Sequence, residues 1–129
     1  MKLLVLLLNL LQEIGVPEAV FRDADGDTWV VSERNGLYQD QGRGMVRVRA
    51  DLLDDYCQIN CSYEDVAGNL WIGTQGKGLT CLGKGQFTNY TTRNGLRSDY
   101  ITDLALGNNH LLYVGTNAGC ETISSANGG

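Results

Sequence analysis

The feature that most constrains the fold is an internal repeat with a period of 42 residues. A short segment built around an aromatic residue occurs three times, and the aromatic positions are Trp29, Trp71 and Tyr113. No insertion or deletion is needed to keep the register from Arg22 to Ala105. A period of this length is typical of repeat architectures, in which each unit buries its apolar face against the next.

Each unit is predicted to contain four short strands separated by turns rich in Gly, Asn and Asp. The expected strands are dense in β-branched and aromatic residues, and no helical period is present. A four-stranded antiparallel unit that repeats every 40–45 residues is characteristic of a β-propeller blade. The predicted fold is therefore all-β: a partial β-propeller of about three four-stranded antiparallel blades. The expected strands around the second aromatic position are residues 58–63, 70–74, 79–82 and 86–90, and the next unit opens with 100–105.

The chain divides into an N-terminal apolar segment, residues 1–17, and β-propeller repeats, residues 18–129. The apolar run Leu3–Leu11 is too short to span a membrane, which takes about 20 apolar residues. A signal peptide with a weak cleavage site and a first buried strand both fit this segment. Propellers close with 4–8 blades, so we expect a fragment of a longer protein whose remaining blades complete the ring. Self-association through the open blade faces is the alternative.

Composition excludes some partners and cofactors. The 15 acidic and 10 basic residues leave a net charge of −5, which argues against a nucleic-acid partner. The four cysteines lack the spacing of a zinc site. We expect Cys57 and Cys61 to pack as small hydrophobic side chains rather than to form a disulfide with each other. No metal and no cofactor is predicted. The other two cysteines are Cys81 and Cys120.

No catalytic residue is predicted. The acidic run Asp23–Asp27 lacks the Gly and Glu spacing of a calcium loop, so a solvated turn is expected. The neighbouring carboxylates Asp54–Asp55 and Glu64–Asp65 would point to opposite faces of a strand and would not converge. His110 has no identifiable nucleophile as a partner.

Ligand binding is the more promising chemistry, and its candidates lie in the loop that joins two successive units. Propellers bind ligands at one end of the central channel, through such loops. The candidates are Arg93, Arg97, Asp99 and Tyr100, which offer two guanidinium groups, a carboxylate and an aromatic ring. These groups suit a small polar ligand such as an oligosaccharide. The alternative is that they are ordinary polar loop residues.

The second unit resembles the two-component regulator propeller repeat. The resemblance is carried by Tyr63–Thr74 with Gly78–Leu79, and by residues 85–91 and 94–101. It extends from about residue 18 to residue 120. The outer units depart from the pattern: Val31–Ser32 replaces Gly-Thr in the first, and the third has Tyr113 for Trp and Gly119–Cys120 for Gly-Leu.

The resemblance implies a bacterial sensor region. Members of that family carry tandem repeats that form seven-bladed propellers outside the cytoplasmic membrane, ahead of an output such as a histidine kinase or a diguanylate cyclase. We therefore expect a periplasmic or extracytoplasmic ligand-sensing module of a two-component signalling protein, with no enzyme activity in this segment. The alternatives are a propeller lyase of the streptogramin-lyase type and a non-catalytic protein-binding scaffold.

Overall fold

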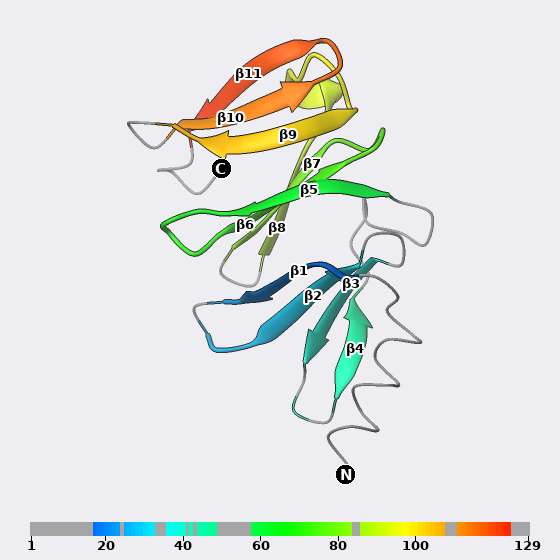
Figure 1. Ribbon diagram of the computed structural model, residues 1–129, viewed down its shortest axis with the longest axis vertical. Coiled ribbons are helices and arrows are strands. Elements are labelled where there is room, and N and C mark those ends of the chain that lie inside the picture. The colour runs from blue at the N-terminus through cyan, green and yellow to red at the C-terminus, as the bar shows by residue number, and fades with distance from the viewer. Residues whose placement is uncertain are drawn as a thin grey trace.

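The computed structural model shows three antiparallel sheets stacked one on another along the long axis of the molecule (Figure 1). It describes residues 17–23, 25–32, 36–40, 42, 44–48, 58–83, 86–107 and 111–124. In each sheet the strands follow one another in chain order, so every strand pairs with its sequence neighbour. The first sheet contains β1 (Pro17–Arg22), β2 (Thr28–Ser32), β3 (Gly36–Asp40) and β4 (Met45–Val48); the second contains β5 (Ile59–Glu64), β6 (Leu70–Thr74), β7 (Leu79–Gly83) and β8 (Gln86–Tyr90); the third contains β9 (Ile101–Leu106), β10 (Leu111–Thr116) and β11 (Gly119–Ser124).

This arrangement is that of consecutive propeller blades. Among the first strands of the sheets, β5 contacts both β1 and β9, while the last strands lie at the outer edge. The third sheet has three described strands rather than the predicted four. Among the described residues no helix has the length and apolarity of a membrane span.

The 42-residue period extends to an irregularity in the backbone. In the first strand of each sheet the pairing register shifts by one residue, which makes a β-bulge. The bulged residues are Glu18, Asn60 and Thr102, at equivalent positions of the three units. The Asn60 side chain donates a hydrogen bond of 2.9 Å from Nδ2 to the Ile101 carbonyl, which links β5 to β9.

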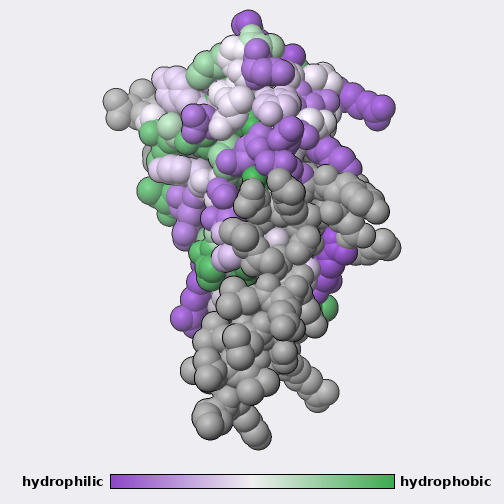
Figure 2. All heavy atoms as spheres, turned by 45° about the vertical axis from the view of Figure 1, so that its right-hand side comes forward, coloured by the Kyte–Doolittle hydropathy of each residue, from purple (hydrophilic) through white to green (hydrophobic). Residues whose placement is uncertain are grey.

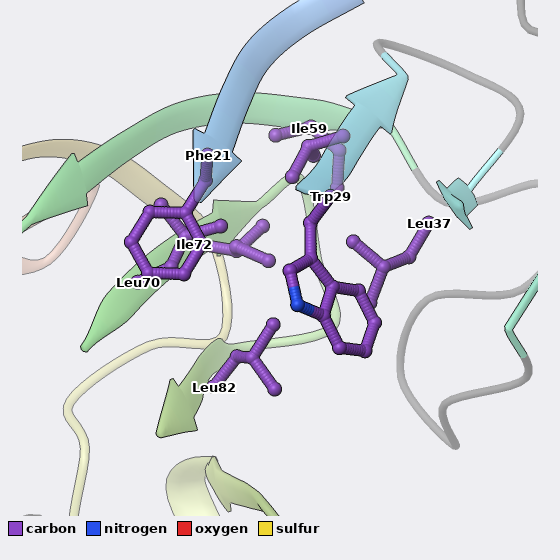
Figure 3. Packing of buried hydrophobic residues seen from close by; sticks show 8 residues of the cluster. Phe21, Trp29, Leu37, Ile59, Leu70, Ile72 and Leu82 are labelled. Carbon is purple, nitrogen blue, oxygen red and sulfur yellow. The ribbon is translucent and has the colours of Figure 1, made fainter. Parts of the chain in front are cut away.

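The first hydrophobic cluster fills the space between the first and second sheets (Figure 3). Trp29 of β2 is 4% exposed and meets Phe87 of β8 edge to face, with 6.1 Å between the ring centroids. Figure 3 shows its indole pointing into a group of aliphatic side chains from both sheets. The buried members are Phe21, Trp29, Val31, Leu37, Ile59, Leu70, Ile72 and Leu82.

The second cluster lies between the second and third sheets, with Trp71 at its centre. Trp71 is fully buried and packs beside Tyr90, with 5.8 Å between the ring centroids. A Cβ atom on Gly73 would come within 2.5 Å of Cys61 Sγ and 2.6 Å of Ile101 Cγ2, so this glycine permits the close approach of the sheets. The buried members are Trp71, Leu79, Cys81, Leu96, Ile101, Leu112 and Val114.

Tyr113 occupies the equivalent register position, but the expectation that it fills a gap between blades is wrong. Trp71 pairs with Tyr63 of β5, and Tyr113 pairs with Ala105 of β9, which is 42 residues after Tyr63. The Tyr113 side chain is nevertheless 42% exposed. Its face of β10 is the one on which, in the first two units, the next sheet packs, and no described sheet covers that face of the third.

Candidate ligand-binding loop

The candidate loop, residues 91–100, connects the outer strand β8 to the inner strand β9 of the next sheet. Because strand direction alternates within each sheet, this loop emerges at the same end as the β6–β7 and β10–β11 turns. Figure 1 shows the short 3-10 helix η1 (Thr92–Asn94) beside the β10–β11 turn. All four predicted ligand-binding residues therefore lie at the strand ends that carry the β6–β7 and β10–β11 turns.

The first half of the loop is held by a capping box and a left-handed glycine. The Thr91 hydroxyl accepts a hydrogen bond from the Arg93 N–H at 3.1 Å, and Asn94 Oδ1 accepts one from the Thr91 N–H at 3.0 Å. Gly95 then ends the helix with a φ of 104°, a conformation that costs glycine little. Leu96 follows and is buried in the second cluster. The chain is thus fixed on both sides of Arg93.

Asp99 secures the second half of the loop. Its carboxylate accepts hydrogen bonds from the Thr92 N–H at 2.7 Å and from the Thr92 hydroxyl at 3.4 Å. Its backbone carbonyl accepts from the N–H groups of Gly76 and Gly78, at 3.2 and 2.8 Å, which ties the loop to the β6–β7 turn. Asp99 is therefore a structural anchor, and a contact with a ligand stays a prediction for it.

The loop is also joined to the third sheet. The Arg97 N–H donates to Glu121 Oε2 at 2.6 Å, and the Asn117 N–H donates to the Tyr100 carbonyl at 3.3 Å. Tyr100 forms an isolated bridge with Gln75 and is half-buried. The loop is thus bonded to the third sheet through Glu121 and Asn117 and to the β6–β7 turn of the second through Gln75, so it spans the junction of two blades.

The guanidinium groups of Arg93 and Arg97 are the parts of this loop that its own structure leaves unused. Both side chains are exposed, and within the described part of the chain neither guanidinium has a hydrogen-bond or ion-pair partner. The loop thus presents two positively charged guanidinium groups from a backbone that its own hydrogen bonds hold in place. The face drawn in Figure 2 mixes hydrophilic residues with smaller hydrophobic areas.

The acidic turn at the first sheet has a structural explanation. Asp23 Oδ1 accepts from the N–H groups of Asp25 and Asp27, at 3.0 and 2.9 Å, and Oδ2 accepts from Trp29 Nε1 at 2.7 Å. The expected turn is confirmed, and Gly26 takes the positive φ, 87°, that it requires. In the described ranges no group of three or more His, Cys, Asp or Glu side chains could hold a metal ion.

The second sheet contains the same arrangement, an aspartate that accepts hydrogen bonds from both the turn and the following tryptophan. It was not predicted from the sequence. Asp65 is buried, with Oδ1 accepting from the Ala67 and Asn69 N–H groups and Oδ2 accepting from Asn69 Nδ2 and from Trp71 Nε1 at 2.9 Å. An Asp six residues before each Trp was the available signal. In the third unit Gly107 replaces this Asp, and any side chain there would overlap the ring of Tyr113.

The cysteines behave in two ways. Burial, with smaller effects from the Asp103 and Glu18 carboxylates, raises the pKa of Cys61 to about 12. Burial and then the charge of Asp65 raise the pKa of Cys81 to about 12 as well, so both are protonated thiols that pack in the core.

The Cys120 side chain is exposed, on the uncovered face of the third sheet that also carries Tyr113. The remaining sequence candidates, Cys57, Asp54–Asp55, His110 and residues 1–16, lie outside the described residues. The expectations for them stay predictions.

Comparisons with known proteins match the repeat and the fold. The family model named two component regulator propeller matches residues 53–76. Among solved structures, PorZ, an essential bacterial surface component of the type-IX secretion system of Porphyromonas gingivalis, is 25% identical with a TM-score of 0.62, over 86% of this chain and 18% of that one. The extracellular domain of a putative hybrid two component system from B. thetaiotaomicron is 23% identical with a TM-score of 0.62, over 86% of this chain and 15% of that one. Virginiamycin B lyase from Staphylococcus aureus is 13% identical with a TM-score of 0.60, over 88% of this chain and 40% of that one. Comparison with curated proteins gives no match.

The resemblance predicted from the sequence is confirmed by the family model that matches part of the second unit. The all-β fold of partial propeller blades is confirmed as well. The chain spans less than a fifth of the length of PorZ and of the two component system domain that it matches.

Proposed function

We propose that this chain is part of a sensor-type β-propeller that binds a small polar ligand outside the cytoplasm and passes the signal to a two-component output. The observation that carries the proposal is the match of residues 53–76 to the two component regulator propeller, within a repeat that continues through all three sheets. The propeller folds of two component extracellular domains support it. Periplasmic or extracytoplasmic placement in a bacterium is part of the proposal.

The loop 91–100 is the proposed binding surface. It lies at the end of the stacked sheets, spans two blades, and holds Arg93, Arg97 and Tyr100 on a backbone that is fixed before a ligand arrives. Preorganisation of this kind lowers the entropic cost of binding. An oligosaccharide, with many hydroxyl groups and apolar ring faces, suits such a mixture of guanidinium and aromatic groups.

A lyase and a protein-binding scaffold are the competing functions. The likeness to virginiamycin B lyase, at 13% identity, is a likeness of fold. PorZ is described as a surface component of a secretion system, so a propeller of this kind also fits a scaffold. In the larger protein, the remaining blades are the proposed partners of the open sheet faces.

Calorimetric titration of the purified protein with a panel of oligosaccharides tests the proposal. We expect saturable binding of at least one member, with no change in the sugar on subsequent chromatography. Conversion of the streptogramin quinupristin in a parallel incubation would favour the lyase. Absence of both sugar binding and turnover would refute the sensor proposal and leave the scaffold.

A further inference from the structure

Both carboxylates near the loop 91–100 are engaged by the loop's own donors. Asp99 accepts from the backbone N–H and hydroxyl of Thr92, and Glu121 accepts from the Arg97 backbone N–H. Backbone N–H groups make charge-assisted hydrogen bonds to a carboxylate. These donors take the place that a cationic side chain would otherwise occupy at Asp99 and Glu121. Neither carboxylate bonds to a guanidinium.

The two arginines of the loop 91–100 are not engaged in this way. Arg93 and Arg97 are exposed, and their guanidinium groups lack partners among the described residues. This is notable in a chain whose net charge is −5, where acidic groups outnumber basic ones.

A guanidinium is a planar fork of five N–H donors with no acceptor. Its geometry matches carboxylate, sulfate and phosphate groups, which can each accept two parallel hydrogen bonds from it. A neutral sugar hydroxyl uses only part of this fork. The hydrogen bonds that fix Thr91, Asn94 and Asp99 set the backbone positions from which both forks project.

We infer that the ligand of the loop 91–100 carries an oxyanion, and that Arg93 and Arg97 hold it. The inference rests on the proposed ligand-binding function and narrows it from polar ligands in general to acidic ones. Carboxylate, sulfate and phosphate share the required chemistry. An acidic saccharide is the ligand class that combines this group with the hydroxyls and ring faces that suit Tyr100.

The test follows the arginine Nε–H signals of the whole chain by NMR while glucuronate or glucose is added. These two sugars differ in having a carboxylate or a CH2OH group at carbon 6, so they form a matched pair. We expect saturable shifts at Arg93 and Arg97 with glucuronate and none with glucose. Arg22 is the internal control, because it is exposed at the opposite end of the sheets, where its Nε donates to the Gly26 carbonyl.

Substitution identifies the donors. Arg93→Gln and Arg97→Gln should each weaken glucuronate binding about tenfold, the effect of losing one charge-assisted hydrogen bond. Arg22→Gln should leave it unchanged. Parallel titrations with inorganic sulfate and phosphate show whether a carboxylate, a sulfate or a phosphate is preferred.

The outcomes separate this inference from the function on which it rests. Non-saturable shifts of similar size at Arg22, Arg93 and Arg97 would indicate general ionic screening and would overturn the inference. Glucose or a neutral oligosaccharide that binds at the loop equally well in both Gln variants would overturn it while the sensor proposal stands. If no anion and no sugar perturbs the loop, both fail.

Discussion

The buried carboxylate of Asp65 provides a direct test of how each blade is held together. Replacement by alanine removes one acceptor group that serves four donors, namely two backbone N–H groups of the turn, Asn69 Nδ2 and Trp71 Nε1. Trp71 is fully buried, so its indole N–H would have no water to bond with instead. The consequence is a buried donor without a partner in the middle of the second cluster.

The magnitude follows from these contacts. A buried donor that loses its partner costs about 1–3 kcal/mol, and hydrogen bonds to a charged group contribute about 1.5–3 kcal/mol. The Ala67 N–H lies nearer the surface and can recover part of its loss by hydration, whereas Asn69 is buried. We therefore expect Asp65→Ala to lower the free energy of unfolding by about 3–5 kcal/mol. This is a large share of the roughly 5–15 kcal/mol typical of a whole domain.

Two further variants remove fewer of these hydrogen bonds. Asp65→Asn retains one acceptor oxygen for the turn but places an NH2 group against donors, so about 1–3 kcal/mol should be lost. Asp23→Ala, in the half-buried counterpart, removes three hydrogen bonds instead of four and should cost less than Asp65→Ala. Urea unfolding monitored by circular dichroism measures all three.

A double-mutant cycle with Trp71→Phe gives the result that would refute the reasoning. Phenylalanine has no N–H to satisfy, so Asp65→Ala should cost about 1–3 kcal/mol less in that background. An equal cost in both backgrounds would mean that the carboxylate acts on the turn alone. The hydrogen bond from Trp71 Nε1 to Asp65 would then contribute nothing to stability.

Four other predictions concern packing, thiols and the loop. Gly73→Ala should lower the free energy of unfolding by about 1–3 kcal/mol in urea unfolding, because its Cβ would press on Cys61 Sγ and on β9; an unchanged midpoint would contradict the close approach of the sheets. In the native protein at pH 8 a thiol reagent should modify Cys120 much faster than Cys61 or Cys81, and equal rates would contradict their burial. The folded pKa of Cys61 and of Cys81 is raised from 9.0 to about 12, so the native state retains protons that the unfolded chain releases. The contribution of these thiols to stability is therefore complete below pH 9 and is lost as pH rises toward 12, and the loss should be smaller in Cys81→Ala. Asp99→Ala should speed amide hydrogen exchange in the loop 91–100 while leaving exchange in β6 unchanged, and slow exchange in the variant would show that its carboxylate does not hold the loop.

Periodicity and turn chemistry were sufficient to predict the strands. The expected strands at residues 70–74 and 86–90 coincide with β6 and β8, and the others agree to within one residue at the ends. Strand formation depends on local alternation and on Gly-rich turns, both of which are visible in the chain. The equivalence of Trp29, Trp71 and Tyr113 follows from the period for the same reason. Their pairing with Phe21, Tyr63 and Ala105 in the first strands confirms it.

What a side chain contacts could not be read in this way, because a contact depends on which sheet lies opposite. Trp71 and Tyr113 share a repeat position, yet one is fully buried and the other 42% exposed, since a neighbouring sheet covers only the first. Asp99 and Arg97 lie in the same loop. In the folded chain the Asp99 carboxylate accepts a hydrogen bond from the Thr92 N–H, whereas the Arg97 side chain is exposed. The order of polar and apolar residues along the chain thus determined the strands and their repeat. The packing of one sheet on the next decided which aromatic rings are buried and which charges remain available to a ligand.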